Sequence, residues 1–188
     1  MGTATHGADV DIIADTMRRL RTRWDGRITL EIIGAKSAAA DWYARLDVPA
    51  SVAHSYPRFV QWLRAQAKRW VLGVAPLIGS RFNAAKSVLK YLDYAALGLP
   101  SILSDVEAYS SLRAQPYARL ARNAPAPWYF ATSALLRDES LAHKIACGAK
   151  GYVRGSHTLG VQATKRRAIW MQLTERPAFH ESRKATYA

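Results

Sequence analysis

The chain has 188 residues, of which 49% are hydrophobic and 22% are charged, a composition typical of a folded domain with a substantial core and not of a disordered chain. No stretch approaches the roughly 20 apolar residues that a membrane-spanning helix needs. Cys147 is the single cysteine, so an internal disulfide and a cysteine-based metal cluster are excluded. We expect Cys147 to lie in the core. The formal net charge of +13 indicates an anionic partner, such as nucleic acid, a phospholipid surface or a phosphorylated small molecule, or else simply solvated basic helix faces.

The first part of the chain predicts a helix followed by strands. From Asp9, the expected N-cap, apolar residues recur at helical spacing as far as Leu20. Residues 28–33 are rich in β-branched and apolar side chains and predict a strand that stops at Gly34. A shorter strand is expected around Val52.

The middle of the chain repeats this alternation. Pro57 is well suited to the first turn of a helix, which is followed by an apolar strand over residues 71–75. A helix is expected over residues 84–97, ended by Gly98 as its C-terminal cap, and a further strand over residues 101–104.

The last part predicts a loop and then helices. The loop contains the prolines at positions 116, 125 and 127. Asp138 and Ser156 are the expected caps of two helices that end near Ala149 and Leu173. No basic region followed by an apolar one opens the chain, so no secretory signal is visible and a cytoplasmic location is expected.

Strands that alternate with helices predict an α/β protein with a Rossmann-like parallel sheet flanked by helices. No internal repeat or low-complexity linker interrupts the pattern. We therefore expect one domain over residues 1–176 and a basic tail over residues 177–188. Sheets of this kind bind ligands at the carboxyl ends of their strands.

One stretch, FNAAKSVLKYLDYAALGLPSILSD at residues 82–105, follows such a strand end and carries unusual charges. Two lysines lie one turn apart near the expected helix start, where they repel each other and meet the positive end of the helix dipole. One side of the expected helix carries Asn83, Lys86 or Ser87, Lys90 and Asp93. A diphosphate at the helix start would relieve the repulsion, and the carboxylate could accept hydrogen bonds from a ribose diol. The alternative is a solvent-exposed face on which Lys90 pairs with Asp93.

These residues resemble the donor-binding segment of GT-B glycosyltransferases, specifically bacterial group-one enzymes with the pattern FN-x-x-KS-x-x-K-x-x-E-Y-x-x-x-G-x-P. An APL turn at residues 75–77 and a GTATH opening at residues 2–6 are similar to other elements of the same family. The resemblance extends from Gly2 to about Trp170. It implies the C-terminal, nucleotide-sugar-binding domain of the GT-B fold.

The resemblance also assigns roles to individual residues. Lys86 and Lys90 would contact the nucleotide diphosphate. Asp93 would hold the ribose hydroxyls in place of the glutamate of the family pattern, with a side chain shorter by one methylene. Tyr56 could stack on the base, or it could be a core aromatic at a helix entrance.

The opening loop would contribute Gly2 and Thr3 to donor binding. His6 in this loop would face a phosphate or the sugar as the candidate catalytic residue, and a surface histidine without a role is the alternative. Many related enzymes have an arginine and a lysine in this loop, which stabilise the leaving diphosphate. This chain has Thr3, Thr5 and His6 there instead.

The implied reaction transfers a sugar from a nucleotide diphosphate sugar to a saccharide or lipid-linked acceptor, without a metal or cofactor and with peripheral contact at the inner membrane face. A complete enzyme of this family has two Rossmann-like domains. The chain matches only the second, from just after its first strand. A companion polypeptide that supplies the N-terminal half, a misassigned start and a gene remnant are the open explanations.

Two other functions remain open from the sequence. The chain could be a noncatalytic nucleotide-binding remnant or a regulatory subunit. It could also be a basic nucleic-acid-binding domain whose aromatic side chains stack on bases. The aromatic candidates are Trp62, Trp70, Trp128 and Trp170. We expect these tryptophans to pack in the core, and we expect no specific nucleic acid partner, because the chain shows no recognised nucleic-acid-binding motif.

Overall fold

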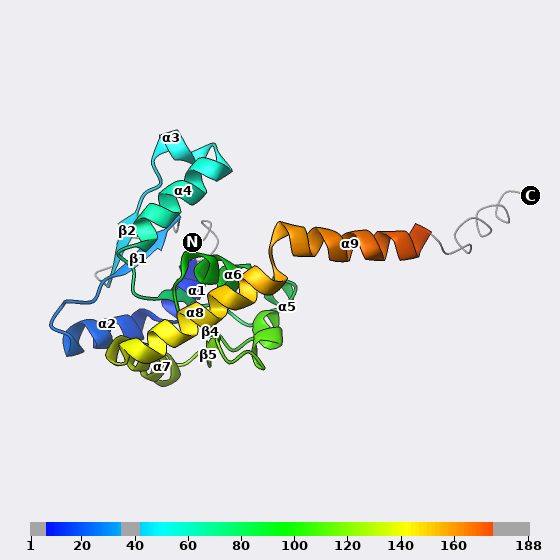
Figure 1. The fold of residues 1–188 in the computed structure, drawn as a ribbon. Helices are drawn as coiled ribbons and strands as arrows, with labels where there is room; N and C mark the ends of the chain where they lie inside the picture. The colour runs from blue at the N-terminus through cyan, green and yellow to red at the C-terminus, as the bar shows by residue number, and fades with distance from the viewer. Residues whose placement is uncertain (1–6, 35–41, 175–188) are drawn as a thin grey trace, which may run out of the picture. The chain divides into compact units, whose positions relative to one another are not determined.

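The structure, a computed structural model, describes residues 7–34 and 42–174 (Figure 1). The chain divides into two compact units, Met1–Lys150 and Gly151–Ala188. All the described strands belong to the first unit. Within the described residues, each helix is too short or too polar to cross a bilayer.

The first helical segment is two helices, α1 (Gly7–Asp11) and α2 (Ala14–Arg23), where the sequence predicted one. Asp9 was expected as an N-cap, and this prediction is wrong. Asp9 lies inside α1 and is buried, and its Oδ1 accepts a hydrogen bond of 2.7 Å from the backbone N–H of Ile78. The carboxylate therefore ties α1 to a loop that lies far away in the sequence.

The first sheet consists of β1 (Leu30–Ile33) and β2 (Tyr43–Leu46), which pair in parallel with Leu30 opposite Tyr43. Strand β1 confirms the prediction, and it ends at Gly34, whose φ of 77° lies in the left-handed region that favours glycine. Strand β2 was not predicted, because four residues with a central exposed arginine carry little strand signal.

The segment between the two sheets is helical. The strand expected around Val52 is wrong, since this residue lies in α3 (Ala50–Ala53). Helix α4 (Tyr56–Ala67) follows, and Pro57 lies in its first turn as predicted. Leu63 and Ala67 form its buried side.

The second sheet has three parallel strands in the order β3 (Gly73–Ala75), β4 (Ser101–Ser104) and β5 (Arg119–Ala121). Both β3 and β4 were predicted. All four residues of β4 are buried, as a central strand requires. Strand β5 was missed because its three residues lie where the sequence predicted only a proline-containing loop. A 3₁₀ helix, η2 (Glu107–Leu112), connects β4 to this region.

The segment that carries Lys86 and Lys90 does not form one continuous helix. Ser80 caps helix α5 (Arg81–Ala84), since its Oγ accepts from the N–H of Asn83 at 3.1 Å. Four residues, 85–88, separate α5 from α6 (Leu89–Leu97). The prediction of one continuous helix over residues 84–97 is wrong. Gly98 ends α6 as predicted, with a φ of 77°.

Helix α7 (Pro125–Arg137) begins where the sequence predicted a loop, because prolines are tolerated in a first helical turn. Asp138 caps α8 (Glu139–Ser156) as predicted, since its Oδ1 accepts from the N–H of Leu141 at 2.8 Å. Helix α8 continues to Ser156, beyond the expected end at Ala149.

In the second unit, α9 (Leu159–Thr174) ends close to the predicted Leu173. Ser156 is not its cap, because the Ser156 hydroxyl donates to the carbonyl of Tyr152 at 2.7 Å. Thr158 takes the capping role, and its Oγ1 lies 3.5 Å from the N–H of Val161.

The core of the first unit forms between helices and the second sheet. Helices α2 and α7 lie side by side (Figure 1). The buried core cluster includes Ile13, Met17, Leu20, Ile102, Trp128, Leu135 and Ile145. The protein is thus a mixed α/β structure with small parallel sheets packed against helices, consistent with a Rossmann-like α/β fold, and the predicted fold class is confirmed.

Several side chains are placed differently from the expectation. Cys147 is exposed on α8, with its Sγ 3.3 Å from Nε2 of His143, so the core prediction is wrong. Trp128 is fully buried, whereas Trp170 on α9 is 70% exposed. Trp62 is half-buried, and its ring centre lies 5.9 Å from that of Phe59. Core packing is therefore confirmed for Trp128 and wrong for Trp170.

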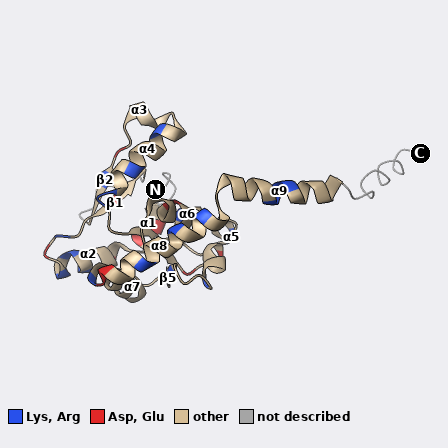
Figure 2. Ribbon diagram, viewed as in Figure 1, with Lys and Arg blue, Asp and Glu red and all other residues tan. Residues whose placement is uncertain are grey.

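The basic residues are dispersed. Figure 2 shows Lys and Arg distributed over several helices, among them α2, α4, α8 and α9. The cluster of Lys165, Arg166 and Arg167 on α9 is exposed, as are Arg18 and Arg19 on α2. These clusters are solvated helix faces.

Candidate functional site

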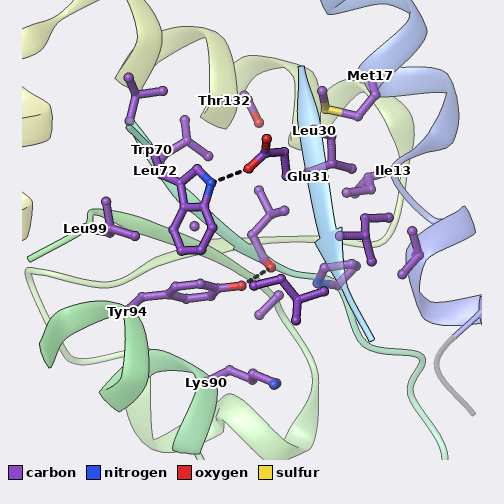
Figure 3. Close-up of a pocket in the computed structure, with 18 of the residues that line it drawn as sticks. Ile13, Met17, Leu30, Glu31, Trp70, Leu72, Lys90, Tyr94, Leu99 and Thr132 are labelled. Carbon is purple, nitrogen blue, oxygen red and sulfur yellow. Dashed lines mark hydrogen bonds between the residues drawn. The ribbon is translucent and has the colours of Figure 1, made fainter. Parts of the chain in front are cut away.

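The first unit contains a cavity of about 830 Å³ between its two sheets (Figure 3). Every residue of β1 and of β3 lines it. Within the described residues, no residue of β2, β4 or β5 does. The cavity therefore lies along the edges of β1 and β3 that are not paired with a neighbouring strand.

Most of the cavity wall is apolar. Ile13 at the start of α2 and Met17 within it line the cavity, together with Leu72 just before β3 and Leu99 just before β4 (Figure 3). A polar cluster lies against this wall, where Oε2 of Glu31 accepts from the indole Nε1 of Trp70 at 2.7 Å and from Arg69 at 2.8 Å.

A second polar cluster in the wall is formed by Lys86, Ser87 and Lys90. The first two precede α6, and Lys90 lies in its first turn. The loop that leaves the carboxyl end of β3 leads through α5 to this cluster, and Pro76 and Leu77 of that loop also line the cavity. The two lysines face one cavity, although they do not share one helix.

The electrostatics of this cluster favour an anion. Burial lowers the pKa of Lys90, and the neighbouring Lys86 lowers it further, while Asp93 acts in the opposite direction. The Lys86 ammonium lies 5.5 Å from the ring centre of Phe82. A half-buried ammonium beside a second cation is stabilised by any negative group that enters the cavity.

Asp93 is placed one turn after Lys90 on α6 and is half-buried. Burial raises the pKa of its carboxyl group, and Lys90 opposes this shift. Asp93 is not among the residues that line the cavity in the described part of the chain. The structure thus brings Lys86, Ser87 and Lys90 together at the cavity wall, whereas Asp93 does not line the cavity.

Asn83 has a structural contact. Its side-chain amide donates to the carbonyl of Ile78 at 2.8 Å, which closes the loop between β3 and α5. It lines a second, much smaller pocket, together with Val106 and Glu107. Its amide is therefore already bonded in the structure.

Tyr56 begins α4 and is 75% exposed, so it is not a core aromatic. It lies outside the set of cavity-lining residues in the described chain. The remaining candidates, Gly2, Thr3 and His6, lie outside the described residues.

Sequence reasoning missed the contacts that hold the loop after β3. The Oγ of Ser104 accepts from the N–H of Leu77 at 2.8 Å and donates to Oδ1 of Asn123 at 2.7 Å. The amide of Asn123 donates in turn to the carbonyl of Leu77 at 2.8 Å. Together with Asp9, these residues fix the chain just before the lysine cluster. A serine at the end of a fully buried strand was the one available signal.

No protein-family model, curated protein or solved structure matches this chain.

Proposed function

We propose that the first unit binds the diphosphate of a nucleotide sugar at Lys86, Ser87 and Lys90, as the donor-binding half of a glycosyltransferase of the GT-B type. The observation that carries this proposal is the placement of both lysines in one cavity at the carboxyl end of β3. Open α/β sheets bind ligands at this end of their strands.

The charges support a diphosphate in particular. Two phosphates carry negative charge over a span that two neighbouring ammonium groups can share, and the Ser87 hydroxyl can donate a further hydrogen bond. The unfavourable burial of the Lys90 charge would then be compensated on binding. A neutral ligand would leave it uncompensated.

The resemblance of residues 82–105 to the family segment supports the choice of ligand and reaction. By this proposal, Asp93 holds the ribose hydroxyls, Tyr56 stacks on the base, and His6 in the opening loop faces the reacting sugar. The acceptor is a saccharide or a lipid-linked sugar, held mainly by the N-terminal half of such an enzyme. Such a reaction takes place in the cytoplasm, at the inner membrane face where the acceptor is lipid-linked.

A thermal-shift screen with UDP, GDP, TDP and ADP tests the binding. At least one nucleoside diphosphate should raise the melting temperature, and Lys90→Ala should abolish the rise. Lys144→Ala is the matched control, because this lysine is exposed on α8 and outside the cavity. A rise that persists in Lys90→Ala would refute the phosphate assignment.

Turnover separates the enzyme from a noncatalytic binder. Sugar transfer by the chain after addition of an N-terminal glycosyltransferase half supports the enzymatic proposal. Binding of a nucleoside diphosphate without transfer under any such condition would identify a nucleotide-binding remnant or regulatory subunit. The nucleic-acid alternative is weakened because Trp128 is fully buried and the Trp70 indole is bonded to Glu31.

A further inference from the structure

The cavity of the first unit is much larger than two phosphate groups require. Its volume of about 830 Å³ falls within the range of roughly 300–1,000 Å³ that pockets for small organic ligands occupy. Voids in a packed protein interior rarely exceed the size of one water molecule. A space of this volume therefore has room for a ligand with a sizeable body, beyond the groups that the lysines can bind.

The wall of the cavity is mainly apolar. Ile13, Met17 and Leu99 line it and are buried. Leu30 and Leu72 also line it and are only half-buried. Apolar side chains that remain partly exposed beside a cavity are stabilised by an apolar ligand that covers them. A sugar diphosphate, which is polar over its whole surface, matches this wall poorly.

The lysines and much of the apolar wall lie at different parts of the cavity. In Figure 3, Lys90 lies on one side, and Leu72 and Met17 lie on the other. Ser87 and Leu89, which are close to Lys90 in sequence, line the cavity and are exposed, so the lysine side is accessible to solvent. A ligand with a charged head and a long apolar body fits this arrangement, with its head at the solvent side and its body inside.

The charges at the cavity select an anionic head. The charged residues that line it are Arg27, Arg69, Lys86, Lys90, Asp9 and Glu31. Glu31 is paired with Arg69 at 2.8 Å, and Asp9 accepts from the backbone N–H of Ile78. Neither lysine forms a salt bridge with another described residue. The two lysines, with the Ser87 hydroxyl as a further donor, therefore suit a carboxylate or a phosphate.

Part of the polar surface along the apolar wall is already satisfied. Val74 in β3 lines the cavity, and its carbonyl accepts from the hydroxyl of Tyr94 at 2.8 Å. The indole N–H of Trp70, which also lies in the wall, donates to Glu31 at 2.7 Å. An apolar body beside these residues leaves both bonds in place, so these groups do not add the cost of burying an unpaired polar atom.

We infer that the cavity also binds a single-chain anionic amphiphile, a fatty carboxylate or an alkyl phosphate. Its head lies at Lys86, Ser87 and Lys90, and its alkyl chain extends along the apolar wall toward Leu72. This site goes beyond the proposed function and does not rest on it. Because both ligands would use the same lysines, the amphiphile would compete with a nucleoside diphosphate.

The test uses the full 188-residue chain and isothermal titration calorimetry with amphiphiles below their critical micelle concentrations. Dodecanoate and dodecyl phosphate carry the proposed heads, and the tighter of the two identifies the head group. We expect either or both to bind saturably, with one molecule per protein. Octanoate should bind more weakly than dodecanoate by about tenfold or more, because each buried methylene contributes roughly fourfold in affinity. Dodecyltrimethylammonium should also bind more weakly by about tenfold or more, because its positive head meets the two lysines.

Three results of these titrations would overturn the inference. They are no saturable binding of either anionic amphiphile, equal binding of octanoate and dodecanoate, and equal binding of the cationic and anionic amphiphiles. Lys90→Ala should weaken binding of the anionic amphiphile by about fivefold. Lys144→Ala, at an exposed position on α8 outside the cavity, should leave it unchanged. Equal binding by Lys90→Ala and the wild type would also overturn the inference.

Variants of the apolar wall locate the alkyl chain. Leu72→Trp fills part of the cavity and should weaken amphiphile binding by about tenfold, whereas Leu173→Trp, at an exposed position on α9, should bind normally. If Leu72→Trp does not melt cooperatively, the smaller change Leu30→Phe replaces it. Unchanged binding in a folded wall variant would overturn the inference.

The wall variants also separate this inference from the proposed function. Both should keep the thermal shift with nucleoside diphosphates, because Leu72 and Leu30 lie away from Lys90 (Figure 3). Amphiphile binding without any nucleotide shift would refute only the proposed function. A nucleotide shift without amphiphile binding would refute only this inference.

Discussion

The hydroxyl of Tyr94 donates a hydrogen bond of 2.8 Å to the carbonyl oxygen of Val74, so a side chain of α6 completes the backbone of β3. Tyr94 is buried, and burial raises the pKa of its hydroxyl well above the usual range. The bond therefore persists at any ordinary pH. It joins the helix that carries Lys90 to the strand that borders the cavity.

Tyr94→Phe should lower the free energy of unfolding by about 1 kcal/mol, because the Val74 carbonyl loses its donor. Urea denaturation measures this change. Tyr56→Phe is the matched control, since Tyr56 is exposed and should give no change. An unchanged free energy of unfolding in Tyr94→Phe would contradict this account.

The ionisation of Tyr109 should lower the free energy of unfolding at alkaline pH. Burial, with a smaller contribution from Asp9, raises the pKa of its hydroxyl from 10.0 to about 12. The folded state thus retains a proton that the unfolded state loses, so the contribution is complete below pH 10 and is lost as the pH rises toward about 12. Unfolding free energies at intervals over this range should fall, and Tyr109→Phe should flatten the fall. Tyr56→Phe should keep the full slope. Parallel curves for wild type and Tyr109→Phe would contradict the prediction.

Lys90→Met should stabilise the protein without ligand while it abolishes the nucleotide response. Because burial lowers the pKa of Lys90, its charge opposes folding at neutral pH, and this penalty shrinks as the pH rises toward the unfolded value of 10.5. We expect a gain of up to about 1 kcal/mol at pH 7, or roughly 2–4 °C in Tm. Differential scanning calorimetry at pH 7 measures it. Lys144→Met, at an exposed position, should show no gain. If Lys90→Met were less stable than the wild type, Lys90 would stabilise the folded protein and this prediction would be wrong.

Gly98 and Gly151 should respond to alanine in opposite directions. Gly98 adopts a φ of 77°, and an added methyl group there has no close neighbour except Lys150 Nζ at 3.9 Å, so backbone strain alone should cost about 1 kcal/mol. Gly151 lies within α8, and a Cβ added there would have no neighbouring atom within 4 Å. Gly151→Ala should therefore raise the free energy of unfolding by roughly 0.5–1 kcal/mol. Chemical denaturation of both variants checks the signs. A neutral Gly98→Ala would contradict the helix-cap assignment.

The sequence predicted those elements whose signals are local. Strands β1, β3 and β4 carry apolar runs, Pro57 begins α4, and Gly98 ends α6, each through the conformational limits of a single residue or a short pattern. Strand β5 could not be predicted, because three residues give no periodicity and its place is fixed by pairing with β4.

The break between α5 and α6 has no such signal. No glycine or proline stands between Ala84 and Leu89, and the helical pattern reads through the gap. Side-chain contacts that no helical pattern encodes fix the chain here: Asn83 bonds to the Ile78 carbonyl, and the loop that contains Ile78 is held by Asp9, 69 residues earlier in the chain. The sequence predicted that Lys86 and Lys90 lie close together because they share one continuous helix. In the structure both line the same cavity, but Lys86 lies in the turn before α6 and Lys90 lies in the helix. The cavity itself depends on how two sheets lie, which no local pattern encodes.

The enclosure of the two strand edges that are open within the described residues has a consequence for how the chain behaves in solution. An open edge on a protein surface templates fibres, because any extended chain can add to it. Here the edges of β1 and β3 face a recess walled by α1, α2 and α6, so an incoming chain has to thread between helices before it can pair. This geometry therefore protects the protein against stacking on copies of itself.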